Sequence, residues 1–335
     1  MTRALRSLLL LGLVGLAAVG GVLLWASQAG SDDFAFVPQA AQPAIGVVEL
    51  DGAPDPPAGA GRVYFTTVGV RHATVWETWF GVDGGALVPE HAVQPDGESD
   101  EERARMDTLA MDDSQQNAEV VALRALGYQV AVRPAGVIIA GIDREAPIAS
   151  SGARLGDVIL SVDRGATRAI DDLRTAVRRA GVDATVDLGL HRDGKLLTVA
   201  ARTIASEQSG KAILGILPAQ AHAVVAPRTV TYSVDGVGGP SAGLAFALQI
   251  YSAGKGYANL HGLRVAATGT LSMVGTVGPI GGVGEKAVGA RRAGATVFLV
   301  PRANAAEARA AQVRGLRIIP VESFSDALRA LAAAG

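Results

Sequence analysis

The sequence predicts a mixed α/β chain of several domains behind one membrane-spanning helix. Three observations support this prediction. An uncharged apolar run covers residues 8–26, strands and turns dominate residues 126–204, and strands alternate with helices from residue 212 onward. At 335 residues the chain is long enough for two or three domains, each with its own core. We therefore divide the chain into residues 1–30, 31–125, 126–204 and 205–335.

The composition excludes several classes of function. The net charge of −2 and a pI near 6 give no electrostatic reason to expect a nucleic-acid partner. The chain has no cysteine, which excludes disulfides, thiolate zinc sites and cysteine nucleophiles. Its five histidines do not cluster with the spacing of metal ligands. We expect no metal, no cofactor and no nucleic acid.

The N-terminal apolar run is long enough to cross a bilayer as a helix, for which about 20 residues suffice. Arg3 and Arg6 precede the run, and this charge bias predicts a cytoplasmic N-terminus. The rest of the chain would then lie outside the cytoplasm as a single-pass membrane protein. The alternative is a signal peptide cleaved after Ser27 and Ala29, which would release a secreted protein.

Residues 31–125 carry no chemistry that the sequence reveals. "RVYFTTVGV" (Arg62–Val70) alternates as a strand does. An acidic segment begins at Asp96, and within it Ser99 and Glu102 form a capping-box pattern. The pattern predicts a helix from there to about Leu126.

Residues 126–204 read as short strands and turns around an amphipathic helix at 170–181, with a hairpin at 191–199. Within them, "REAPIASSGARLGDVILSVDRG" (144–165) resembles the PDZ domains attached to bacterial proteases. The resemblance covers about 75 residues. It implies that a peptide binds as an added strand, with its carboxylate held by backbone N–H groups of a glycine-containing loop. The candidate loop is Leu126, Gly127 and Tyr128; a PDZ domain that binds no peptide is the alternative.

The last part of the chain contains several serine and lysine motifs that can be separated by their context. Gly239-Pro240-Ser241-Ala242-Gly243 fits the G-x-S-x-G elbow of α/β-hydrolases, but the acid and histidine that should follow are missing. Ser252 and Lys255 spell S-x-x-K without its companion motifs. The glycines before Lys286 do not complete a phosphate-binding P-loop. The chain therefore offers no ATP site of this type.

Ser241 and Lys286, 45 residues apart, remain as the candidate catalytic pair. A serine hydroxyl needs a base to take its proton, and a neutral lysine can do so whereas arginine stays protonated. Burial and the first turn of a helix both lower the pKa of a lysine. The glycines at 281–284 predict such a helix start. A glycine-rich turn with a surface lysine is the alternative from this reasoning.

The loop before Ser241 consists of Gly238, Gly239 and Pro240. Pro240 suits a helix start, and glycines allow backbone N–H groups to approach a developing oxyanion. We expect these three residues to form the oxyanion and active-site loop. Thr268 and Thr270 could line the same site, although polar strand residues are more often structural.

"GPSAG" (239–243), "TGTLSMVGTVGPIGGVGEKAVGARRAG" (268–294) and "VP" with Asn304 beyond resemble the proteolytic domain of the Lon family of serine peptidases. The resemblance extends over about 110 residues and implies that Ser241 is the nucleophile and Lys286 its base. With the anchor and the PDZ segment, the chain resembles the membrane-anchored, PDZ-containing Lon-like proteases of bacteria. Members of the family tend to form rings, which implies a homo-oligomer acting on protein or peptide substrates.

The sequence departs from ATP-dependent Lon at two points. It contains no ATPase module, so we expect no use of ATP. The acidic residue usual three positions before the serine is Gly238 here, with Asp235 further upstream. We expect a membrane-anchored, extracytoplasmic, ATP-independent serine endopeptidase whose PDZ domain recognises substrate or gates access. The alternatives are a peptide-binding scaffold with an inactive protease domain and a protein that cleaves only itself.

Overall fold

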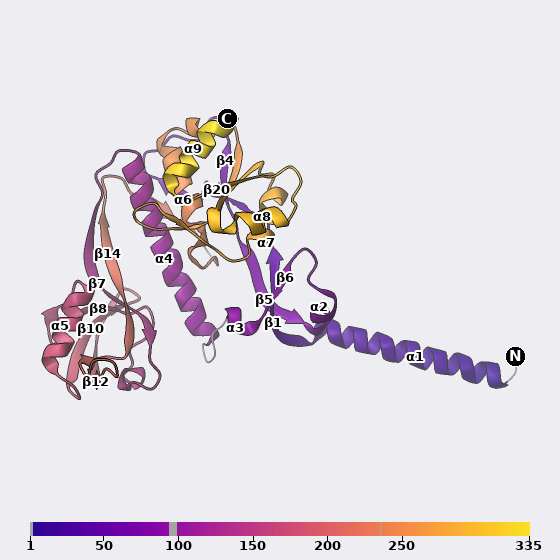
Figure 1. Cartoon of the computed structure of the whole chain (residues 1–335), viewed down its shortest axis with the longest axis horizontal. Coiled ribbons are helices and arrows are strands. Elements are labelled where there is room, and N and C mark those ends of the chain that lie inside the picture. The colour runs from indigo at the N-terminus through magenta and orange to yellow at the C-terminus, as the bar shows by residue number, and fades with distance from the viewer. Residues whose placement is uncertain (1–2, 94–98, 235) are drawn as a thin grey trace. The chain divides into compact units, whose positions relative to one another are not determined.

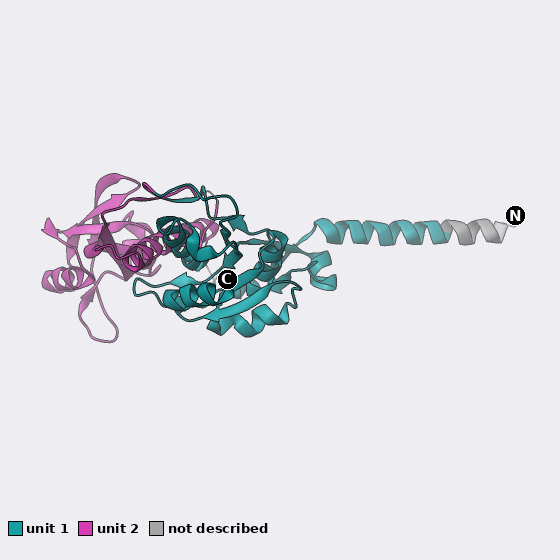
Figure 2. Cartoon of the chain, turned by 90° about the horizontal axis from the view of Figure 1, so that it is seen from above, with its two compact units in different colours: residues 1–49, 53–98, 241–335 teal, residues 50–52, 99–240 magenta. Residues whose placement is uncertain are grey.

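The computed structural model describes residues 3–93, 99–234 and 236–335, with the backbone alone for residues 3–10. The chain forms two compact units. The first comprises residues 1–49, 53–98 and 241–335, and the second comprises residues 50–52 and 99–240 (Figure 2). The side chains of Arg3 and Arg6, positions 96–98 of the acidic segment, and Asp235 lie outside the described residues.

A long helix, α1 (Arg3–Gln28), begins the first unit (Figure 1). Its segment Leu11–Gln28 is long and apolar enough to cross a membrane, and almost all of this segment is exposed. These properties fit a membrane anchor and a signal sequence alike. An antiparallel sheet in the order β5-β1-β6 follows, made of β1 (Gly30–Pro38), β5 (Val68–Thr74) and β6 (Ala86–Val88).

The central sheet of the first unit has five strands in the order β2-β4-β16-β19-β20. Its strands are β2 (Gln42–Pro43), β4 (Arg62–Phe65), β16 (Arg264–Ala267), β19 (Val297–Pro301) and β20 (Arg317–Val321). All are parallel except β2, which pairs antiparallel with β4. The helices of the C-terminal part are α6 (Gly243–Gly254), α7 (Val283–Arg292), α8 (Ala305–Ala310) and α9 (Phe324–Ala334).

We expected residues 31–125 to form a separate region. This prediction is wrong for residues 31–49 and 53–98, which belong to the same unit as residues 241–335. Strand β4 pairs with β16, so residues from both ends of the chain build one sheet. The physical reason is that β16 is an interior strand, buried from Val265 to Ala267, and needs a hydrogen-bonded neighbour on each side. The sequence pattern of residues 62–70 indicates a strand but not its partner, which lies 202 positions further along the chain.

Successive side chains of β4 contact opposite sides of the sheet, as the strand period of two requires. Phe65 packs against Phe246 of α6, with 5.5 Å between ring centroids. Tyr64 lies in the opposite cluster, which includes Val283 and Ala287 of α7. Helices α6 and α7 therefore bury the two faces of the strand.

The second unit contains α4 (Asp100–Ala125) and a sheet in the order β11-β10-β8-β7-β14. The predicted capping box is confirmed, because Ser99 and Glu102 each accept the other's backbone N–H. The sheet strands are β7 (Ala131–Ile142), β8 (Val158–Val162), β10 (Thr185–Arg192), β11 (Lys195–Arg202) and β14 (Ile216–Val225). Helix α5 (Ile170–Ala180) packs on this sheet through Leu173 and Val177.

The sheet extends beyond the boundary predicted at residue 204. Strand β14 pairs with β7 along its whole length, so the first residues of the predicted domain 205–335 belong to this sheet. The remaining elements are short: α2 (Val75–Phe80), α3 (Glu90–Val93), β3 (Val48–Leu50), β9 (Gly165–Ala166), β12 (Ile204–Ala205), β13 (Ala212–Ile213), β15 (Val230–Tyr232), β17 (Thr270–Leu271), β18 (Val277–Gly278) and the 3-10 turns η1 (Pro147–Ser150), η2 (Pro240–Ala242), η3 (Ala258–Leu260) and η4 (Arg302–Asn304).

Candidate active site

Ser241 lies in the 3-10 turn η2, immediately before the buried helix α6. Its carbonyl oxygen accepts two hydrogen bonds, from the Gly269 amide at 2.9 Å and from the Thr268 hydroxyl at 3.2 Å. Both donors follow the end of β16. The central sheet therefore fixes the backbone from which the Ser241 hydroxyl projects.

Lys286 is the fourth residue of α7 and is only 3% exposed. The helix begins after Gly282, whose φ of +65° favours glycine and whose added Cβ would lie 3.1 Å from Val68 Cγ1. Asn304 holds the preceding loop through both the N–H and the carbonyl of Ile280, each at 2.9 Å. Lys286 thus projects from a helix start that is fixed on two sides.

The structure brings the two predicted catalytic residues together. Lys286 Nζ lies 2.8 Å from Ser241 Oγ, within hydrogen-bonding distance. Burial lowers the pKa of Lys286 from 10.5 to about 8, because the ammonium loses its hydration. At pH 7 about one lysine in ten would then be neutral, compared with one in a few thousand for a free lysine. The pair has the geometry and the proton affinity that a serine nucleophile and its base require.

Two buried threonines follow the neighbouring strands β16 and β4. Thr268 follows β16 and donates to the Ser241 carbonyl, as described above. Thr66 follows β4 at the same level, because Phe65 is paired with Ala267 in the parallel register. Thr66 is 1% exposed, and its hydroxyl has no hydrogen-bond partner among the described residues. The sequence did not indicate Thr66, because its place beside Thr268 follows only from the pairing of β4 with β16.

The loop before Ser241 is held by helix α4. The Gly239 amide donates to the Asp107 carbonyl at 2.9 Å, and the Ser114 hydroxyl donates to the Pro240 carbonyl at 3.1 Å. The expected oxyanion role is therefore not available to these two residues here, since the Gly239 amide is engaged and Pro240 has no N–H. A Cβ on Gly238 would lie 2.7 Å from the Asp107 Cβ. A larger side chain at position 238 would therefore collide with helix α4.

The candidate carboxylate loop is the C-terminal cap of α4. The Leu126 and Gly127 amides donate to the carbonyls of Ala122 and Arg124, and the Tyr128 amide donates to that of Leu123. With Gly127 at φ +91°, this is a Schellman motif. The three amides satisfy the helix end and are not free to hold a peptide carboxylate.

The competing S-x-x-K motif does not form a second pair. Ser252 is buried, and its hydroxyl accepts a hydrogen bond from Asn259 at 3.0 Å. Lys255 instead places its ammonium 5.7 Å from the centre of the Tyr251 ring. Within the described ranges, no three His, Asp or Glu side chains gather as a metal site would require.

Comparison with known families finds a match for two parts of the chain. Residues 234–333 match the C-terminal proteolytic domain of Lon protease (S16), and residues 124–203 match a PDZ domain. Lon protease 2 of Bacillus subtilis is 38% identical over 96 residues, which are 28% of this chain and 16% of that protein. Lon protease 1 of Myxococcus xanthus is 39% identical over 94 residues, covering 27% of this chain and 11% of that protein. The matched part is thus a small fraction of these relatives.

Solved structures similar to this chain include the PDZ domain of an SdrC-like protein from Listeria monocytogenes. It is 20% identical, covers 25% of this chain and 86% of its own, and superposes with a TM-score of 0.24. The corresponding domain from Listeria innocua gives a TM-score of 0.23 at the same identity and covers 92% of its own chain. The chain combines a PDZ domain with a Lon proteolytic domain in a mixed α/β structure, as the sequence predicts.

Proposed function

From a chain that combines a Lon proteolytic domain with a PDZ domain, we propose a membrane-anchored, extracytoplasmic, ATP-independent serine endopeptidase. Its catalytic pair is Ser241 and Lys286. The observation that carries this proposal is the 2.8 Å contact between the serine hydroxyl and a lysine that is buried and has a lowered pKa. The match of residues 234–333 to a peptidase domain supports the same reaction class.

The proposed reaction begins when neutral Lys286 takes the proton of the Ser241 hydroxyl. The serine oxygen attacks the peptide carbonyl and forms a tetrahedral intermediate. The protonated lysine then donates its proton to the leaving amine, and an acyl-enzyme remains. Lys286, neutral again, activates the water that releases the acyl group.

The proposed membrane placement and independence of ATP rest on features of the sequence outside the active site. Helix α1 has the length of a membrane span, and the positive-inside bias of Arg3 and Arg6 would direct the units outward. A cleaved signal sequence is the alternative. No P-loop occurs in the 335 residues, which supports proteolysis without ATP. We propose protein or peptide substrates, presented or gated by the PDZ domain, and a homo-oligomer as in the resembling family.

A second candidate function is a peptide-binding scaffold whose protease domain is inactive. The engaged Gly239 amide favours this candidate, because that loop would have to change before its amide could stabilise an oxyanion. The contact between Ser241 and Lys286 favours the peptidase, since a scaffold does not need a buried lysine next to a serine.

The deciding experiment incubates the full chain in detergent with a mixture of unfolded proteins and identifies new termini by mass spectrometry. Ser241→Ala and Lys286→Arg should abolish cleavage, the latter because arginine keeps the charge but cannot act as the base. Ser252→Ala and Lys255→Arg are matched controls from the other S-x-x-K pair, and Lys255→Arg should cleave normally. Cleavage by all variants would place the chemistry elsewhere. No cleavage by the folded wild type would favour the scaffold.

A further inference from the structure

Exposed aromatic side chains gather at one place in the described chain, the end of helix α1. The chain has three tryptophans, Trp25, Trp76 and Trp79. Of the fifteen Phe, Tyr and Trp residues, all in the described part, only Trp25, Trp79 and Phe80 are exposed, at 59%, 55% and 64%. Trp25 belongs to the last turn of α1 and the other two to α2. Such a concentration in a chain with few aromatics points to an interaction surface.

Helix α2 exposes its two C-terminal aromatic side chains, Trp79 and Phe80. Its capping box is complete, because Thr74 and Glu77 bond each other's backbone N–H. Glu77, the charged residue of the helix, pairs with Arg71 through two hydrogen bonds. Trp76 and Phe80 stack with 4.2 Å between ring centroids. None of the six residues of α2 is fully buried, so the helix is not part of a hydrophobic core.

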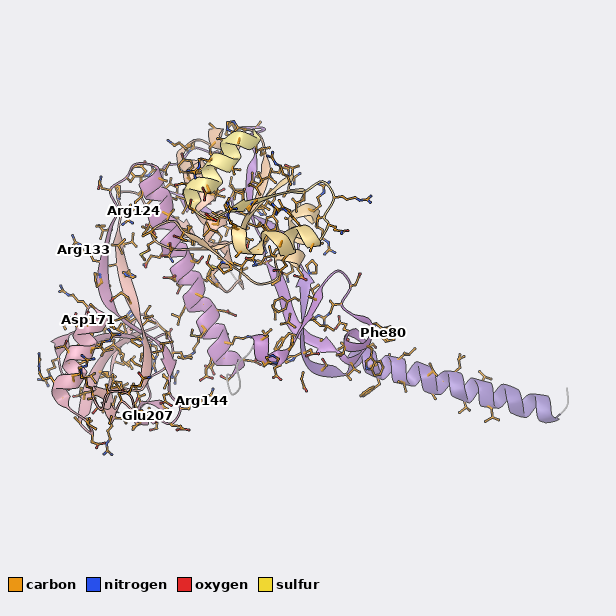
Figure 3. All side chains as sticks on the ribbon, viewed as in Figure 1. Phe80, Arg124, Arg133, Arg144, Asp171 and Glu207 are labelled. Carbon is orange, nitrogen blue, oxygen red and sulfur yellow. The ribbon has the colours of Figure 1, made fainter. Side chains whose placement is uncertain are left out.

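Helix α2 lies next to the C-terminal end of the candidate membrane span in α1. The Val75 amide, the first of α2, donates to the carbonyl of Ala29 at 2.9 Å, one residue past α1. The two helices pack against each other there (Figure 1). Figure 3 shows Phe80 at this junction, beside the end of α1. The span Leu11–Gln28 is about 27 Å long at 1.5 Å per residue, close to the hydrocarbon thickness of a bilayer.

We propose that α2 and Trp25 form an interfacial anchor that lies in the headgroup layer of the phospholipid bilayer crossed by α1. Tryptophan and phenylalanine on a short helix suit this layer, where an apolar ring meets lipid and the indole N–H remains hydrated. The ion pair of Glu77 leaves the helix without an uncompensated charge that would oppose this position. The anchor would fix the orientation of the first unit relative to the membrane plane. The inference rests on the membrane placement of α1 given in the proposed function.

The test measures tryptophan depth in the full chain, reconstituted in phosphatidylcholine vesicles. One variant keeps Trp79 alone (Trp25→Phe, Trp76→Phe), and a second keeps Trp25 alone (Trp76→Phe, Trp79→Phe). A third carries all three Trp→Phe changes and Val274→Trp, whose site is 87% exposed and outside the anchor. All carry Ser241→Ala, so that self-cleavage cannot change the sample. Lipids brominated near the glycerol end or near the methyl end of their chains serve as quenchers.

We expect Trp79 to lose most of its emission with the glycerol-end bromolipids, less with the methyl-end ones, and to resist aqueous acrylamide. The tryptophan at position 274 should show the opposite behaviour. Quenching of Trp25 but not of Trp79 by lipid would overturn this inference and leave the membrane placement of α1 intact. Lack of quenching at both would remove that placement as well. Acrylamide protection of Trp79 that disappears on dilution, without lipid quenching, would show a second copy instead and overturn the proposal.

Discussion

At the scale of single residues, the lowered pKa of Lys286 determines when the proposed reaction can run. The lysine must be neutral to accept the serine proton, so activity should rise with pH and level off above about 8. The measurement is the pH dependence of kcat/KM on an unfolded substrate, with protein stability followed in parallel. An activity that falls as pH rises through 8 would contradict the assignment of Lys286 as the base.

The same residue should cost the folded protein stability at neutral pH. Below pH 8 the lysine is charged in both states, and the folded state bears the full cost of burying the ammonium. Between pH 8 and 10.5 the folded lysine loses its proton before the unfolded one, and the cost disappears as pH rises. The difference between a pKa of 10.5 in the unfolded chain and about 8 in the folded protein corresponds to about 3 kcal/mol.

Lys286→Met should therefore raise the free energy of unfolding by up to about 3 kcal/mol at pH 7, since methionine fills a similar apolar space. The gain should shrink between pH 8 and 10.5. Denaturant titrations at several pH values measure both effects, and Lys255→Met on the exposed surface is the control. A gain independent of pH would show that packing rather than charge burial is responsible.

A substitution at Gly238 tests whether the contact with helix α4 requires glycine at this position, three residues before Ser241. Gly238→Ala places a methyl group against the Asp107 Cβ, and such overpacking costs about 1–3 kcal/mol. We expect a lower melting temperature and a lower cleavage rate. Gly281→Ala is the matched control, because no atom lies within 4 Å of its added Cβ. Equal effects of the two substitutions would show that the loop moves away from α4 easily.

At the scale of elements, the end of α4 distinguishes a structural from a binding role for residues 126–128. The added methyl group of Gly127→Ala would meet no neighbouring atom, but alanine is strained at φ +91°. We expect this strain to lower the free energy of unfolding by about 1 kcal/mol. We expect reduced stability in denaturant titrations and unchanged affinity for a labelled C-terminal peptide. Loss of peptide affinity at unchanged stability would restore the carboxylate-loop hypothesis.

Local patterns predicted those elements whose evidence lies within a few residues. The start of α4 follows from Ser99 and Glu102, and the pairing of Ser241 with Lys286 follows from motif chemistry and from resemblance. The position of Thr66 and the bond between Gly239 and Asp107 depend on contacts over more than 100 residues. No local pattern records such contacts, so the sequence did not reveal them. The strand predicted at 62–70 divides into β4 and β5 because each half joins a different sheet.

At the scale of the whole molecule, the domain boundaries read from the sequence divide a folding unit. The first unit contains residues from both sides of the segment 99–240. A protease domain cut at residue 205, as the sequence suggested, would lose β4 and expose one edge of β16. It would also lose Phe65 from the α6 face and Tyr64 from the α7 face.

We therefore expect the fragment 205–335 to lack a cooperative unfolding transition and to cleave nothing. An interior parallel strand without its neighbour leaves backbone groups unpaired and apolar side chains in water. Adding a second fragment, residues 30–93, should restore folding, because it supplies β2 and β4 together with the β1 sheet. The control is the same fragment with Val63→Asp. Val63 is a buried residue of β4, and a carboxylate there would oppose burial in the core, so this fragment should not restore folding. Circular dichroism melts and cleavage of an unfolded substrate give the two readouts. A fragment 205–335 that melts cooperatively and cleaves alone would show that β4 is dispensable, and the central sheet would then be complete without the N-terminal residues.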